Sequence, residues 1–122
     1  MPRVIHFEIA ADDPERAVAF YRQAFGWKIE KWEGPMEYWL VETGPADEPG
    51  IDGGLGRRTS PGEGTVNTIG VDDIDAALEK VLTNGGKVIG PKHAVPGVGW
   101  LAYCADTEGN AFGLMQDDPT AL

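Results

Sequence analysis

The sequence predicts an α+β fold built from two βαβββ modules, because a strand and a helix recur in the same order in each half. The predicted helices run from Asp13 to Gly26 and from Asp73 to Gly86. The two starts are 60 residues apart in a chain of 122, close to half its length. A repeat of this kind indicates a duplicated unit. The Gly- and Pro-containing segment 59–64 falls where a joint between the modules is expected.

In the first module, the apolar stretch Val4–Ala10 predicts a strand, and a helix follows it. Asp13 suits the N-cap position, and Pro14 suits the first helical position. Gly26 supplies the left-handed residue that commonly ends a helix. One helical face is apolar, since residues of that kind recur at a spacing of three and four: Ala17, Phe20, Tyr21 and Ala24.

The remaining strands are predicted from runs of β-forming residues between turn residues. In the first module they are Trp27–Trp32, Glu37–Thr43 and a short glycine-rich strand in Ile51–Arg58. The second module, about residues 65–116, repeats the order of the first, about residues 1–58. It begins with the strand Thr65–Val71, and its helix has one apolar face. Its later strands are Lys87–Ile89, Gly99–Ala105 and Ala111–Gln116, with a long turn between the first two of these. Two such modules can form one domain, with a curved, mixed, eight-stranded sheet around a cavity and the helices outside.

Composition restricts the classes of partner. The chain has 10 basic and 20 acidic residues and a net charge of −10, which argues against nucleic acid and anionic membranes. No apolar run approaches the roughly 20 residues that span a bilayer. A single cysteine, Cys104, rules out an internal disulfide framework and suits a cytoplasmic protein. We expect that cysteine to be a small buried hydrophobic residue rather than a nucleophile.

Five motifs, one of which is Phe25–Trp27, resemble those of the vicinal-oxygen-chelate superfamily, which includes glyoxalase I, bleomycin-resistance proteins, fosfomycin-resistance enzymes and extradiol dioxygenases. The other four are His6–Ile9, Asp13–Tyr21, Val71–Ala77 and Asp106–Phe112. The resemblance covers nearly the whole chain. It implies the paired βαβββ fold, a homodimer, and one divalent metal held by four side chains from the first and last strands of each module.

This sequence departs from the metal-binding pattern that the resemblance implies. The first-strand position of the first module is His6, which is a suitable ligand. In the second module, Val66 stands at the first-strand position and Gly113 stands at the last-strand position. Neither side chain can bind a metal. The remaining position falls within Gly53–Gly56, which has no carboxylate. We therefore expect no cofactor, and the ligand positions do not support a divalent metal, although one is possible. The glycines either enlarge a ligand cavity or let aromatic rings pack closely.

His6 and Glu8 are the candidate catalytic residues. They are two positions apart on one strand and therefore share a face. The pair could act as a general base with an orienting carboxylate, or hold a metal jointly. The alternative is a structural His–Glu pair, or one that faces a dimer partner. His93, the other histidine, is expected to be exposed in a loop.

A ligand platform is predicted from aromatic residues on strands, because one of each adjacent pair faces inward. Ordinary core packing is the competing interpretation for such residues. The candidate ligand-binding residues are Trp39 (next to Tyr38), Trp100 and Tyr103, with Asn67 and Gln116 as polar groups.

Three functions remain open on these grounds. The first is a metal-independent protein of the bleomycin-resistance kind that binds a small organic molecule. The second is a glyoxalase-like, metal-dependent lyase or isomerase with a degenerate site around His6 and Glu8. The third is a non-catalytic interaction module whose cavity is filled by its own side chains.

Overall fold

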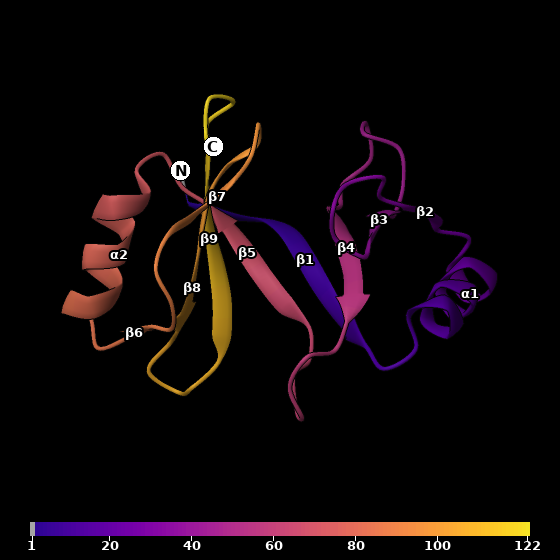
Figure 1. Ribbon diagram of the computed structural model, residues 1–122, viewed down its shortest axis with the longest axis horizontal. Helices are drawn as coiled ribbons and strands as arrows, with labels where there is room; N and C mark the ends of the chain where they lie inside the picture. The colour runs from indigo at the N-terminus through magenta and orange to yellow at the C-terminus, as the bar shows by residue number, and fades with distance from the viewer. Residues whose placement is uncertain (1) are drawn as a thin grey trace. The chain divides into compact units, whose positions relative to one another are not determined.

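The computed structural model describes residues 2–122 and divides them into two compact units (Figure 1). The N-terminal unit comprises His6–Thr65, and the C-terminal unit comprises residues 2–5 together with Val66–Leu122. Each unit contains one helix and its own hydrophobic core.

The N-terminal unit has the order βαβββ. Its elements are β1 (Arg3–Ala11, of which the first three residues belong to the other unit), α1 (Pro14–Phe25), β2 (Lys28–Lys31), β3 (Tyr38–Glu42) and β4 (Asp52–Arg57). The strands lie in the order β2-β3-β4-β1, in which β1 is parallel to β4 and the other pairs are antiparallel.

Local chemistry sets the ends of α1 as predicted. The Asp13 carboxylate accepts a hydrogen bond from the backbone N–H of Arg16 at 3.2 Å, and Pro14 follows in the first turn. At the other end Gly26 adopts a φ of 71° and donates its N–H to the carbonyl of Arg22. A residue with a Cβ rarely adopts this left-handed conformation, so the glycine stops the helix.

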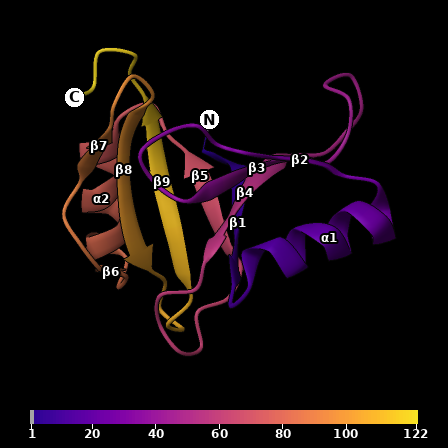
Figure 2. The same cartoon turned by 45° about the vertical axis from the view of Figure 1, so that its right-hand side comes forward.

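The C-terminal unit repeats this order with one added strand. Its elements are β5 (Val66–Gly70), α2 (Ile74–Thr83), β6 (Lys87–Val88), β7 (His93–Val95), β8 (Gly99–Ala105) and β9 (Ala111–Asp117). The strands lie in the order β5-β9-β8-β6, with β7 also paired to β8. Here β5 is parallel to β9, and Figure 2 shows α2 beside β8.

Strand β7 raises the number of strands within residues 2–122 to nine, where the sequence predicts eight. It lies in the segment predicted to be a long turn. The left-handed Gly97 (φ 76°) and the hydrogen bond from Val98 N–H to the Val95 carbonyl close a tight turn that pairs β7 with β8. His93 is exposed, as expected, but belongs to this strand rather than to a loop.

Helix α2 begins in the same way as α1. The Asp73 carboxylate accepts a hydrogen bond from the backbone N–H of Ala76 at 3.1 Å. A second side chain also binds this end, because the amide oxygen of Gln116 on β9 accepts from the backbone N–H of Ile74 at 2.9 Å. The mixed α+β architecture of two βαβββ modules is thus confirmed.

Each helix covers one face of its own unit's strands with a hydrophobic core. Fully or nearly buried residues of the N-terminal core are Ala11, Val18, Ile29, Trp39, Val41 and Leu55. Those of the C-terminal core are Ile74, Ala102, Cys104 and Leu114. Cys104 is 0% exposed, so its prediction as a buried hydrophobic residue is confirmed. Across residues 2–122 we find no helix that is both long and apolar enough to span a membrane.

Candidate functional site

The strands of the N-terminal unit have one face against α1 and one face turned away from it. Phe7, Ile9 and Ala11 of β1 pack into the core beneath the helix. Because neighbouring strand residues point to opposite sides, His6 and Glu8 lie on the other face, which we call the open face. The predicted sharing of one face by these two residues therefore agrees with the packing of β1.

His6 and Glu8 lie close together and are partly shielded from water. Their side chains are 33% and 32% exposed, and His6 Nε2 is 3.8 Å from Glu8 Oε1. This distance is too long for a direct hydrogen bond. Burial lowers the pKa of His6, partly opposed by the Asp52 carboxylate, so the imidazole is neutral near pH 7. Burial also raises the pKa of Glu8, and the Glu63 carboxylate adds to the rise.

Tyr38, the first residue of β3, completes the site. Its hydroxyl oxygen lies 3.1 Å from His6 Nε2. The hydroxyl donates to this nitrogen when the imidazole carries its proton on Nδ1. A neutral His6 therefore presents an acceptor to a tyrosine hydroxyl, with the Glu8 carboxyl beside it.

A glycine makes room for the Tyr38 ring. A Cβ atom at Gly54 would lie 1.6 Å from the tyrosine hydroxyl oxygen and 2.0 Å from Cζ, so any side chain there would displace the ring. At Gly56, two residues along β4, the nearest ring atom would be 3.8 Å away, which is an ordinary contact. Tyr38 thus lies over β4, with its hydroxyl above Gly54. Of the two predicted roles of these glycines, close aromatic packing is the one that the geometry supports.

Trp32 supports Tyr38 from the side. Their rings meet edge to face with centroids 6.3 Å apart, and the backbone N–H of Trp32 donates to the backbone carbonyl of Tyr38 at 2.7 Å. The indole in turn covers Gly34, where a Cβ would lie 2.2 Å from the ring. The segment before β3 therefore helps to hold the tyrosine hydroxyl against His6.

The residues at the predicted metal-ligand positions do not supply a set of ligands. Within residues 2–122, no group of three or more His, Cys, Asp or Glu side chains is placed to hold an ion. In the N-terminal unit the space at Gly54 is taken by Tyr38. In the C-terminal unit Val66 begins β5, and a Cβ at Gly113 would lie 3.2 Å from Thr68 Oγ1. The side chains at these positions do not fit a metal with three or four protein ligands.

Trp39 lies on the opposite side of β3 from the site. It is 6% exposed and packs in the core beneath α1 with Val41 and Leu55. Lys31 Nζ lies 5.5 Å from the centroid of its ring. Its place in the core does not suit a ligand platform, and the neighbouring Tyr38 is the aromatic residue that reaches the open face.

Trp100 and Gln116 have structural partners on the helix side of the C-terminal unit. Trp100 packs against the core, and its indole N–H donates to Asp118 Oδ2 at 3.1 Å. Gln116 binds the start of α2. Neither arrangement suits the ligand contact that the sequence analysis predicts for these two residues.

Asn67 and Tyr103 are the other two predicted ligand-binding residues. Asn67 is exposed on β5 and alternates with the buried Thr68, which places the two on opposite faces. Tyr103 lies between the core residues Ala102 and Cys104 on β8, so it faces away from α2. Both belong to the C-terminal unit, whereas His6 belongs to the N-terminal unit.

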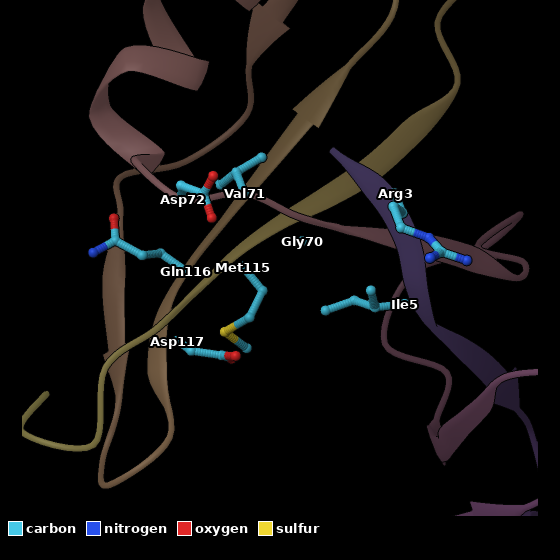
Figure 3. Close-up of a pocket in the computed structure, with 8 residues that line it drawn as sticks. All are labelled: Arg3, Ile5, Gly70, Val71, Asp72, Met115, Gln116 and Asp117. Atoms are coloured by element: carbon cyan, nitrogen blue, oxygen red, sulfur yellow. The ribbon is translucent and has the colours of Figure 1, made fainter. Parts of the chain in front are cut away.

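The C-terminal unit has a surface hollow of its own, with a cavity volume of about 240 Å³. Its eight lining residues are Arg3, Ile5, Gly70, Val71, Asp72, Met115, Gln116 and Asp117 (Figure 3). In this view the Arg3 guanidinium points away from Met115, and Gln116 extends the opposite way. Arg3 and Gln116 therefore do not converge on one point of the hollow.

Asp52 was not predicted as a member of the site, and Tyr38 was named only as the neighbour of Trp39. The sequence contains a signal for Tyr38. Trp39 and Val41 lie on one side of the predicted strand, whereas Tyr38 and the charged Glu42 lie on the other. Placing the Trp39–Val41 side in the core turns Tyr38 toward the open face. Asp52 could not be found in this way, because its influence on His6 depends on the pairing of β1 with β4.

Comparison with known proteins places this chain among relatives of one kind. A family model described as Glyoxalase/Bleomycin resistance protein/Dioxygenase superfamily matches residues 3–114. A glyoxylase-like domain-containing protein from Didymella fabae is 34% identical over 112 residues, which make up 88% of each chain. Relatives from Mycobacterium bovis and Mycobacterium tuberculosis that carry a provisional glyoxylase name are 29% identical over 118 residues. The chain spans 43% of their length.

Solved structures share the fold at lower identity. A hypothetical protein from Bacillus halodurans has a TM-score of 0.72 at 19% identity, covering 99% of this chain and 98% of that one. Methylmalonyl-CoA epimerase from Mycobacterium tuberculosis has a TM-score of 0.71 at 14% identity, with coverage of 95% and 88%. At such identities the likeness concerns the fold alone.

Proposed function

Because this chain belongs to the Glyoxalase/Bleomycin resistance protein/Dioxygenase superfamily, we propose that it binds a small organic molecule on the open face of its N-terminal unit, without a metal ion. The binding groups are the His6 imidazole and the Glu8 carboxyl, which lie beside the Tyr38 hydroxyl. Small-molecule sites use a few convergent polar groups of this kind to orient a ligand.

The observation that carries the proposal is the hydrogen bond of 3.1 Å between the Tyr38 hydroxyl and His6 Nε2, above Gly54. It joins two polar groups from β3 and β1 at a place where β4 has no side chain. The imidazole and the nearby carboxyl are each about one-third exposed. A ligand can therefore reach both groups.

The donor set supports binding without a metal. A metal site needs about three protein ligands, whereas this cluster offers one imidazole and one carboxylate, with a tyrosine ring over Gly54. Elemental analysis of protein purified without a histidine tag, after incubation with Zn, Ni, Mn or Fe, tests this point. We expect no retained ion. About one ion per chain, lost in His6→Ala, would overturn metal-free binding.

The charges around the site restrict the ligand. Glu8, Asp52 and Glu63 are the carboxylates whose fields act on the cluster. They disfavour an anionic ligand, so the ligand is neutral or cationic. Such a ligand differs from those of several structural neighbours, which are solved in complex with coenzyme A derivatives, because coenzyme A is strongly anionic.

Binding can be tested by a thermal-shift screen of neutral and cationic planar compounds, followed by NMR titration. We expect a ligand to shift the His6 ring signals and to lose most of its affinity in His6→Ala. His93→Ala is the matched control, because His93 is exposed in the other unit. A ligand that binds wild-type protein and His6→Ala equally would show that the site lies elsewhere.

A second candidate function is proton transfer, as in a lyase or isomerase. The observation that favours it is a neutral imidazole with a carboxyl 3.8 Å away, since a general base must be unprotonated before it acts. The test is exchange of ligand C–H protons with D₂O in the presence of protein. Exchange that His6→Ala abolishes would favour catalysis, and binding without exchange would favour a binding protein.

A further inference from the structure

Tyr38 lies against β4 in the way a bound aromatic ligand would. A Cβ atom on Gly56 would lie 3.8 Å from its Cδ1, and the hydroxyl end fills the space that a Cβ on Gly54 would take. The strand offers two residues without side chains beneath one planar ring. A flat aromatic group therefore fits this surface.

The polar end of the ring has a defined partner. The hydroxyl oxygen is 3.1 Å from His6 Nε2, and Glu8 Oε1 is 3.8 Å from the same nitrogen. A neutral imidazole accepts a hydrogen bond from a hydroxyl equally well when the hydroxyl belongs to a ligand. The surface and its acceptor together match the chemistry of a phenol.

Tyr38 can leave this position without loss of the sheet. It is the first residue of β3, and the six residues before it, 32–37, form no helix or strand. Its side chain is only partly buried, and its ring meets Trp32 edge to face. Rotation about the Cα–Cβ bond would expose Gly54 and leave the pairing of Tyr38 with Gly56 in place.

We propose that Tyr38 occupies the ligand position in the free protein, and that the ligand displaces it with a neutral hydroxylated aromatic ring of its own. This inference rests on the proposed function, because it takes the open face to be the binding site. Tyr38 then determines specificity in two ways. It excludes ligands that cannot replace its contacts, and it lowers apparent affinity by the fraction of protein in which it still covers Gly54.

The test uses p-cresol, which reproduces the tyrosine side chain, with toluene and 4-methylbenzoate as probes that lack the hydroxyl or carry a negative charge. Each is titrated by NMR into wild-type protein and Tyr38→Ala. We expect p-cresol to bind Tyr38→Ala about tenfold more tightly than it binds the wild type, and about tenfold more tightly than toluene binds the variant. The His6 ring signals should shift, and His6→Ala combined with Tyr38→Ala should abolish the preference for the hydroxyl.

Two further variants keep the result decisive. Tyr38→Phe retains the ring over Gly54 but not its hydrogen bond, so its affinity for p-cresol should lie between those of wild type and Tyr38→Ala. Tyr21→Ala removes a tyrosine from the helix side of the same unit, where it stacks on Trp27 at 5.0 Å. Tyr21→Ala should show no increase in affinity for p-cresol that depends on His6.

Opposite outcomes would overturn the inference. If Tyr38→Ala folds normally but binds p-cresol no better than the wild type does, then Tyr38 does not occupy the ligand position. If toluene binds Tyr38→Ala as tightly as p-cresol does, the ligand does not need a hydroxyl group. If some other compound binds at His6 and is weakened by Tyr38→Ala, this inference fails while the proposed function stands. If no compound shifts the His6 signals, both fail.

Discussion

A Cβ atom on Gly54 would lie 1.6 Å from the hydroxyl oxygen of Tyr38, which is far inside van der Waals contact. We therefore predict that Gly54→Ala forces the Tyr38 ring away from β4 and breaks its hydrogen bond to His6. Overpacking of this kind costs about 1–3 kcal/mol of unfolding free energy. Urea unfolding measures that cost, and the His6 ring signals report the lost contact.

Gly56→Ala is the matched control for this substitution. It adds the same methyl group on the same strand and face, but its Cβ would be 3.8 Å from the nearest Tyr38 atom. We expect its stability to change by less than that of Gly54→Ala and the His6 signals to stay in place. Equal effects of the two substitutions would mean that general disturbance of β4, and not contact with Tyr38, is responsible.

Gln116→Ala should destabilise the C-terminal unit. The side-chain oxygen of Gln116 is the acceptor for the backbone N–H of Ile74, whose residue is only 1% exposed. A buried donor left without a partner costs about 1–3 kcal/mol. Thermal or urea unfolding checks this value, with the exposed Asn67→Ala expected to be nearly neutral. Loss of ligand affinity without loss of stability would instead support the ligand-binding role expected from sequence.

Asp106 should make the stability of the β8–β9 turn depend on pH. Its carboxylate accepts hydrogen bonds from the Asn110 backbone and side chain and from the Glu108 backbone, at 2.9–3.1 Å. These hydrogen bonds hold the pKa of Asp106 below its usual value of 3.8, and those from Asn110 have the largest effect. The stabilisation is therefore complete above the ordinary pKa and is lost as pH falls through the lower, folded-state pKa.

Asp106→Ala should accordingly unfold at a lower urea concentration than wild type at pH 7, and the difference should shrink in strong acid. Asp47→Asn, which removes a carboxylate from another exposed turn, is the comparison variant and is unfolded over the same pH range. A difference that stays constant from neutral to strongly acidic pH would show that the lost stability does not come from the ionised carboxylate.

Features fixed by neighbouring residues could be predicted from the sequence. Both helices begin at the expected aspartates, because an N-cap needs only a carboxylate and an N–H three residues later. The two βαβββ modules followed from the repetition of that signal. Strand β7 was missed because its three residues form a strand only through pairing with β8. The homodimer and the cytoplasmic location remain predictions.

The candidate site could be predicted only in part. His6 and Glu8 were found because their shared face follows from a spacing of two along one strand. The position of Tyr38 over Gly54 depends on the register of β3 with β4, which pairs Tyr38 with Gly56. No local pattern sets this register. Trp39 was predicted in place of Tyr38 for the same reason, since the core that holds Trp39 includes residues from β2 and β4.

Cys104 gives a direct test of the C-terminal core. The residue is 0% exposed and packs with Ile74, Ala102 and Leu114, and burial raises the pKa of its thiol. The thiolate is the reactive form, so both effects slow its attack on a disulfide reagent. We predict that 5,5′-dithiobis(2-nitrobenzoate) labels the native protein slowly and labels one thiol per chain at once in guanidinium chloride. Thr107→Cys, which places a cysteine at an exposed position, is the positive control and should react in the native protein. If native Cys104 reacts as fast as that control, the core between α2 and β8 opens readily, and burial does not protect the thiol.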